Sequence, residues 1–150
     1  MASLARQIAR QTAQRDQGSA LLEFALGTVV LFSLVFCFIE VCLIAYTRDT
    51  ISECAREGTR YAMVRGASCP NTASPTCEVS ASQVNTYVSA IRLPNLAGGT
   101  MTVATTYPDG NEAVGSRVQV LVSYAFTIRV PLVPAHAINL SSTSKVYILQ

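Results

Sequence analysis

Apolar residues are concentrated in one long run near the start of the chain. No residue is charged from Phe24 to Ile39, and the run extends from Leu21 to Tyr46 if Glu23 and Glu40 are included. At 1.5 Å per residue, a helix over 21–46 is about 39 Å long, which exceeds the roughly 30 Å hydrocarbon core of a bilayer. The pattern therefore predicts one transmembrane helix, over residues 19–46.

The helical period continues beyond this run and becomes amphipathic. Neither Pro nor Gly occurs between Thr28 and Glu57, so nothing in the sequence interrupts the helix at the membrane surface. Small and apolar residues recur at intervals of three and four and form a narrow stripe: Ile51, Cys54, Ala55, Gly58, Tyr61 and Ala62. Gly66 is a stop signal. The pattern predicts an amphipathic stalk helix over residues 47–66 that continues the transmembrane helix.

The remaining residues, 67–150, have the pattern of a small exported α+β head. A short helix is predicted to begin near Ser80 or Ser82 and to end before Pro94. Apolar and polar residues then alternate, which predicts strands over residues 101–107, 118–130 and 140–149. Alternation leaves one face apolar and one polar, as in antiparallel sheets. The expected fold is α+β: a long N-terminal transmembrane and stalk helix, then a small antiparallel sheet head with one short extra helix.

Composition and charge exclude several classes of function. The chain is 50% hydrophobic and 13% charged, which is too apolar for a disordered chain. Its net charge of +2 comes from dispersed basic residues, so no nucleic-acid partner is expected. The sequence has a single histidine, His136, and no nucleophile motif, glycine-rich phosphate loop or paired carboxylates outside the helices. We therefore expect no enzyme activity, no cofactor, no metal site and no small-molecule substrate.

Basic residues before the apolar run indicate its orientation. The segment before the run has three basic residues, Arg6, Arg10 and Arg15, and one acidic residue, Asp16. By the positive-inside rule, the N-terminus stays in the cytoplasm and the head is exported. A conventional secretory signal would need a shorter apolar core followed by a small-x-small cleavage site, and this run offers neither. The run is therefore predicted to be a signal-anchor.

Glu23 is unusual because it lies inside the apolar run. A carboxylate within a membrane helix costs roughly 2.5–3.5 kcal/mol on insertion scales, so its presence indicates a function. Gly18, the small residue Ser19 and an apolar run with Glu as the fifth residue after the glycine resemble the processing site of type IV pilin precursors. The resemblance implies that a prepilin peptidase cuts between Gly18 and Ser19 and removes a basic leader, residues 1–18. It also implies that Glu23 and Phe24 help the mature helix to join an assembly. The alternative is an ordinary signal-anchor with Glu23 at the headgroup level.

A second block of residues narrows this resemblance. Glu23-Phe24-Ala25-Leu26 is followed in the stalk by Cys54-Ala55-Arg56-Glu57-Gly58-Thr59-Arg60-Tyr61-Ala62. The two motifs, in this order, resemble the TadE-like family of pseudopilins within the type IV pilin superfamily, and the resemblance covers residues 18–64. The matching residues of the block are Ala55, Arg56, Glu57, Gly58, Arg60, Tyr61 and Ala62. Their expected role is architectural, in an amphipathic helix that packs on the head. Many relatives carry a proline shortly after Leu26, and this chain does not.

The resemblance implies a minor pilin or pseudopilin that takes part in the assembly or anchoring of a Tad (tight-adherence) type IVb pilus. Its implied location is the bacterial inner membrane. Its implied partners are the membrane, prepilin peptidase, other pilin or pseudopilin subunits and Tad assembly proteins. Two alternatives remain open: a pseudopilin of a type II secretion system, and a single-pass, signal-anchored exported binding domain.

Two cysteines of the head, Cys69 and Cys77, bracket a segment rich in Pro, Ser, Thr and Asn. In an oxidising exported compartment they are expected to pair as a disulfide. A loop this short contributes on the order of 2–3 kcal/mol in the chain-entropy account of disulfides. The alternative, a metal site, has no His, Asp or further Cys nearby in the sequence. Cys54 is expected to be buried on the stalk.

Overall fold

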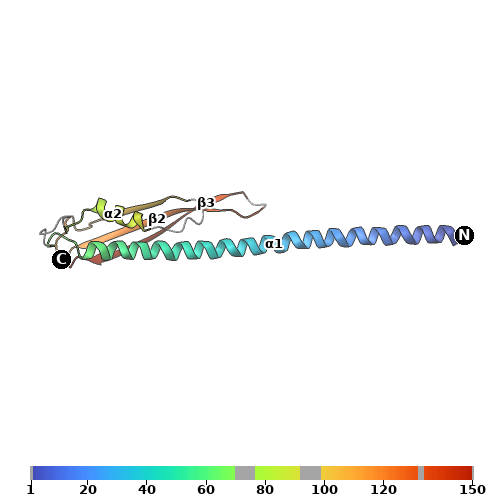
Figure 1. The fold of residues 1–150 in the computed structure, drawn as a ribbon, viewed down its shortest axis with the longest axis horizontal. Coiled ribbons are helices and arrows are strands. Elements are labelled where there is room, and N and C mark those ends of the chain that lie inside the picture. The colour runs from blue at the N-terminus through green and yellow to red at the C-terminus, as the bar shows by residue number, and fades with distance from the viewer. Residues whose placement is uncertain (1, 70–76, 92–98, 132–133, 150) are drawn as a thin grey trace.

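The computed structural model describes residues 2–69, 77–91, 99–131 and 134–149, with side chains from residue 18 onward. Over these residues the chain forms a long helix, a short helix and a three-stranded sheet, in the order α1, α2, β1, β2, β3. The head lies along the C-terminal part of α1, and the rest of α1 projects away from it as a rod (Figure 1). The predicted α+β fold is confirmed.

Helix α1 spans Ala2–Met63, 62 residues, and is therefore about 93 Å long. The prediction began this helix near Ser19, but the helix continues back through the basic leader, where Ala, Leu, Gln and Arg all favour helix. The helix ends at Met63, three residues before the predicted end of the stalk at residue 66. Just beyond it, the N–H of Arg65 turns back to the carbonyl of Ala62 at 3.1 Å. Gly18 and Ser19 thus lie inside an uninterrupted helix.

Helix α2 spans Ala81–Ala90 and begins with a capping box. The backbone N–H of Ser80 donates to Oε1 of Gln83 at 2.9 Å, and the N–H of Gln83 donates to the carbonyl of Ser80 at 3.0 Å. These bonds satisfy groups that the first turn of a helix otherwise leaves unpaired. Of the two predicted starting points, Ser80 is therefore the N-cap and Ser82 lies within the helix.

The sheet is antiparallel with strand order β1-β2-β3, where β1 is Met101–Thr106, β2 is Arg117–Ile128 and β3 is His136–Tyr147. The first two strands lie within a residue or two of their predicted bounds. The third was predicted over 140–149, but it begins at His136, which pairs with Ile128. The first two residues, His136 and Ala137, are exposed and give no alternating signal; the alternation of half-buried and exposed residues begins at Ile138, which packs against the core.

The core lies between one face of the sheet and the two helices. Helix α1 packs on β2 and β3, and α2 packs on β1 and on α1. Every second residue of β2 points into this layer and is buried, while its neighbours on the other face are half-buried. The buried apolar residues include Ile51, Cys54, Ala55, Ala62, Val84, Val88, Val118, Val120, Val122, Tyr124, Phe126 and Ile148. The stripe predicted on the stalk is the face that α1 presents to the sheet.

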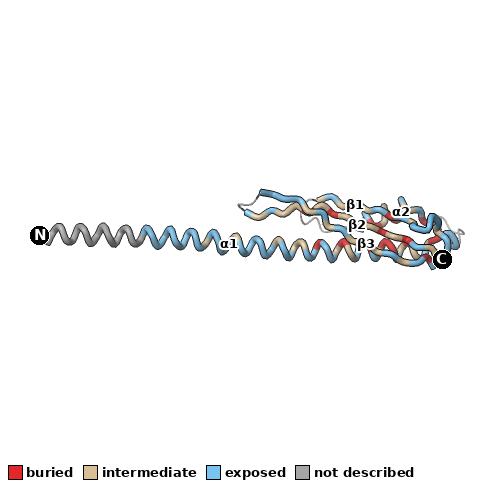
Figure 2. Tube along the Cα trace, turned by 180° about the vertical axis from the view of Figure 1, so that it is seen from behind, coloured by how far each residue is buried: buried red, intermediate tan, exposed pale blue. Residues whose placement is uncertain are grey.

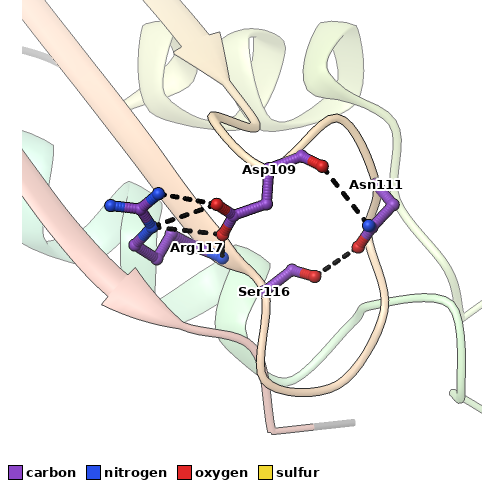
Figure 3. A network of polar contacts seen from close by, with 4 residues as sticks. All are labelled: Asp109, Asn111, Ser116 and Arg117. Carbon is purple, nitrogen blue, oxygen red and sulfur yellow. Dashed lines mark hydrogen bonds and ion pairs between the residues drawn. The ribbon is translucent and has the colours of Figure 1, made fainter.

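A loop between β1 and β2 closes the end of the head farthest from the N-terminal rod. Its turn has a hydrogen bond from Gly110 N–H to the carbonyl of Tyr107 at 3.0 Å, and Gly110 has a φ of 74° that favours glycine. The carboxylate of Asp109 accepts two kinds of hydrogen bond from Arg117 (Figure 3). The backbone N–H of Arg117 donates to Oδ2 at 2.8 Å, and the Arg117 guanidinium donates to Oδ1 at 2.6 Å. Asn111 accepts a hydrogen bond from the Ser116 hydroxyl and donates to the carbonyl of Asp109 at 3.3 Å.

The Asp109–Arg117 pair predicts a specific acid sensitivity of the head. Hydrogen bonds from the Arg117 side chain and backbone lower the pKa of Asp109 from 3.8 to about 2. A carboxylate whose pKa is lower in the folded than in the unfolded state stabilises the fold at pH values above the unfolded-state pKa. This stabilisation is lost as the pH falls through the folded-state pKa. The melting-temperature difference between the native protein and Asp109→Asn should therefore be present at pH 7 and shrink between pH 4 and pH 2. A difference that stays constant down to pH 2 would contradict the assignment.

Candidate membrane-assembly site

The N-terminal part of α1 stands clear of the head. From Gly18 to Ile39 the residues are exposed except for Thr28 and Ser33, which are half-exposed, as the pale blue rod in Figure 2 shows. Phe24 is 74% exposed. Within Gly18–Met63 the helix is long and apolar enough to cross a membrane, which is consistent with a single-pass anchor.

The sequence-predicted processing and assembly residues all lie on this exposed rod. Gly18, Ser19, Glu23 and Phe24 fall on two adjacent turns of α1 and are exposed. Where side chains are described, no hydrogen bond or ion pair reaches Glu23. In lipid, its carboxylate would need a partner from outside this chain, since a buried charge without one is costly.

The second acid of the apolar run, Glu40, is placed differently. Its Oε1 accepts a hydrogen bond from the backbone N–H of Arg129, just after β2, at 3.1 Å. Its Oε2 is buried with no partner among the described residues. The head therefore begins to contact α1 at Glu40, so the predicted transmembrane segment and the sheet-covered part of α1 overlap over residues 40–46. Sequence reasoning missed this contact, although Glu40 continues the sheet-facing stripe at helical spacing with Leu43 and Thr47.

Gly58 lies where α1, α2 and β2 approach most closely. A Cβ at this position would come within 2.6 Å of Cγ2 of Val88 and 3.2 Å of Cγ1 of Val120. The adjacent motif residues Ala55 and Ala62 are buried on the same side. Small side chains here let three elements share one core, which is the architectural part of the motif.

The polar side of the motif binds α2 to α1. The Tyr87 hydroxyl of α2 donates to Oε1 of Glu57 at 3.2 Å, and the Tyr87 ring stacks on Tyr61 with centroids 4.0 Å apart. Burial, followed by the bond to Glu57, raises the pKa of Tyr87. The Arg65 guanidinium lies 4.1 Å from the centre of the Tyr61 ring. The motif therefore holds the second helix of the head as well as the sheet.

The two arginines of the motif point outward. Arg56 pairs with Glu53 at 2.7 Å and Arg60 lies 4.0 Å from Glu57, with side chains 59% and 72% exposed. Exposed pairs of this kind contribute about 0.2–1 kcal/mol. Arg56 and Arg60 therefore contribute little to holding the head and remain available to a partner. Thr59 between them is buried, and its hydroxyl lies 3.0 Å from that of Ser144 on β3.

Cys69 and Cys77 are joined as a disulfide with Cα atoms 5.6 Å apart, and residues 70–76 of the loop between them lie outside the described residues. Cys54 is buried on the sheet-facing stripe, where burial, followed by the charge of Glu53, raises the pKa of its thiol. Cys37 and Cys42 are exposed on the rod. Within the described part of the chain, no three His, Cys, Asp or Glu residues lie close enough together to hold a metal ion.

The disulfide gives a direct prediction for the stability of the head. Cys77→Ser should lower the free energy of unfolding by on the order of 2–3 kcal/mol, because an eight-residue separation closes a short loop. Thiol labelling of the unsubstituted protein after denaturation should modify Cys37, Cys42 and Cys54. Cys69 and Cys77 should stay unlabelled until a reductant is added. Labelling of Cys69 and Cys77 without a reductant would contradict the pairing.

Comparison with known protein families finds a match for one segment of the chain. Residues 18–60 match the family of TadE-like proteins. The matched segment holds Gly18, Glu23 and Phe24 on the exposed rod and most of the block around Gly58, and it ends before Tyr61. Neither a curated protein nor a solved structure matches the chain. Residues 18–60 are thus similar to TadE-like proteins.

Proposed function

We propose that this chain is a minor pilin or pseudopilin that takes part in assembling or anchoring a Tad pilus, without catalysis of its own. The observation that carries the proposal is the extent of the TadE-like segment, residues 18–60. It joins the exposed rod with Glu23 to the block that holds the head. In this role α1 supplies the contact with the membrane and with neighbouring subunits, and the head is carried at its end.

In this proposal α1 crosses the bacterial inner membrane once. Residues 1–18 form a cytoplasmic leader, 19–46 the membrane segment, 47–66 the stalk and 67–150 the exported head. The orientation is supported by the arginines before the apolar run, Arg6, Arg10 and Arg15, because positively charged flanks stay in the cytoplasm. The disulfide between Cys69 and Cys77 suits an oxidising compartment on the other side.

Prepilin peptidase is the proposed processing partner, with cleavage between Gly18 and Ser19. Both residues are exposed, so an enzyme within the membrane surface can reach them. The bond lies inside a helix, and cleavage requires that helix to open locally. Gly18 favours opening because glycine in a helix costs about 1 kcal/mol relative to alanine.

Cleavage would create a partner that Glu23 lacks among the described side chains of its own chain. The new amino group of Ser19 lies one helical turn from Glu23, where it can meet the Glu23 of a neighbouring subunit when helices pack side by side. An ion pair in lipid is favourable only when both charges are matched. A subunit out of register would leave a charge unmatched, so the pair would select one register.

The mass of the mature protein tests the processing step. Protein purified from cells with prepilin peptidase should lack residues 1–18 and begin at Ser19, whereas cells without the peptidase should yield the chain with its leader. Gly18→Ala, which leaves the rod otherwise unchanged, should reduce the cleaved fraction. The same N-terminus in both kinds of cell, with residues 1–18 still present, would refute cleavage.

A further inference from the structure

The hairpin formed by β2 and β3 runs beside α1 toward the N-terminal rod and ends at the level of the apolar run (Figure 1). This level is defined by the hydrogen bond of 3.1 Å between Arg129 N–H and Glu40. The strands pair without interruption up to Ile128 and His136, and these ends of β2 and β3 are the ones nearest the rod.

The same level coincides with the outer boundary of a bilayer. A hydrocarbon core of about 30 Å takes about 20 helical residues. A span that begins at Leu21 reaches this length at Glu40, and a span that begins after Glu23, at Phe24, reaches it at Leu43. In the first register Arg129 is level with the outer edge of the hydrocarbon core, and in the second it lies about 4.5 Å inside that edge. In both registers the last residues of the proposed membrane segment, 19–46, reach into the headgroup region.

The residues that the hairpin presents there suit this region. Of the connection, Val130, Pro131, Pro134 and Ala135 are described, all are uncharged, and the last three are exposed. The exposed Arg129 precedes them. The opposite end of the head differs in chemistry, because its loop carries Asp109 and Glu112 as well as Arg117. An apolar tip with a flanking arginine is the arrangement that lies in a membrane interface, whereas a charged loop stays in water.

We propose that the described residues at the rod-side ends of β2 and β3 are a second lipid contact of this protein, in addition to α1. Val130, Pro131, Pro134 and Ala135 enter the outer headgroup and acyl boundary of the bilayer that α1 crosses, and the Arg129 guanidinium lies among the lipid phosphates. Glu40 holds the hairpin against α1 at this depth. The inference rests on the proposed membrane span of α1, and it means that the head lies on the membrane surface rather than on a free stalk.

The chain has no tryptophan, so a single introduced tryptophan reports its own depth. We would reconstitute the full-length protein in phosphatidylcholine and phosphatidylglycerol vesicles with bromine at shallow or deep acyl positions. Ala135→Trp tests the hairpin, with Val130→Trp as a second position. Phe32→Trp, at a site 55% exposed on the rod, controls for the span, and Val114→Trp, at a site 54% exposed in the opposite loop, controls for water.

The emission of Ala135→Trp and of Val130→Trp should be quenched more by shallow than by deep bromine. Phe32→Trp should be quenched strongly and Val114→Trp should not be quenched. If the hairpin tryptophans behave like Val114→Trp while Phe32→Trp is quenched, the lipid contact is refuted and the span stands. If Phe32→Trp escapes quenching, the proposed span itself fails. The emission of Ala135→Trp could instead shift to the blue as the protein density in the vesicles rises, without quenching by bromine at either depth. This result would mean contact with another copy of the chain, and it would also overturn the proposal.

Two substitutions of Glu40 give a matched pair of variants for the same quenching measurement. Added to Ala135→Trp, Glu40→Leu removes the acceptor for Arg129 N–H and should reduce the shallow quenching. Glu40→Gln keeps an acceptor oxygen and should preserve it. Equal quenching in both double variants would refute the role of Glu40 in holding the hairpin at this depth.

Discussion

Replacing Gly58 by leucine should lower the melting temperature of the head by roughly 12–24 °C. A Cβ at this position already lies 2.6 Å from Val88 and 3.2 Å from Val120, and both valines are fully buried. Three further carbons have no free space, so α1 must move away from α2 and β2. Overpacking of this kind costs about 3 kcal/mol at the upper end of its usual range, and each kcal/mol shifts the melting temperature of a small domain by about 4–8 °C.

The experiment has a matched control in the same helix. Gly27 has no atom within 4 Å of an added Cβ, so Gly27→Leu should leave the head unchanged. Gly58→Ala should have a smaller effect than Gly58→Leu, because alanine recovers about 1 kcal/mol of helix propensity. Near-ultraviolet circular dichroism of the full-length protein in detergent would follow the melting. A native melting temperature for Gly58→Leu would show that α1 does not meet Val88 and Val120.

Glu23→Ala should reduce incorporation of the protein into pilus assemblies by at least about 100-fold. In the proposed assembly, alanine leaves the amino group of a neighbouring Ser19 without its carboxylate in lipid. Removing one partner of a buried ion pair costs about 3–5 kcal/mol, and each 1.4 kcal/mol is a factor of ten in an equilibrium constant. The measurement is the amount of protein that co-purifies with the other pilin subunits, relative to its amount in the membrane.

The control for this experiment is a carboxylate outside the membrane segment. Glu53→Ala removes an exposed ion pair with Arg56 and should leave incorporation within about twofold, because such pairs are worth less than 1 kcal/mol. The membrane level of Glu23→Ala should be equal to or above that of the native protein, since alanine inserts more readily than glutamate. Native incorporation of Glu23→Ala would refute the pairing.

Local patterns in the sequence were enough to predict the main elements of the fold. The charge-free run from Phe24 to Ile39 and the stripe from Ile51 to Ala62 predict one long helix, because both depend only on the helical period. Strict alternation from Val118 onward predicts β2, and the serines at 80 and 82 mark the start of α2 to within two residues. The residues resembling a pilin processing site, Gly18 to Glu23, are likewise recognisable without any tertiary contact.

What the sequence by itself determined is therefore the set of elements, their apolar faces and the TadE-like residues. The tertiary structure alone decided where the head begins to cover α1, because apolar residues that face lipid and those that face a sheet look the same in one chain. It decided that Glu40 binds the Arg129 backbone, that β3 starts at His136, and that Gly58 faces two valines from different elements. These contacts join residues far apart in the sequence, and no local period encodes them.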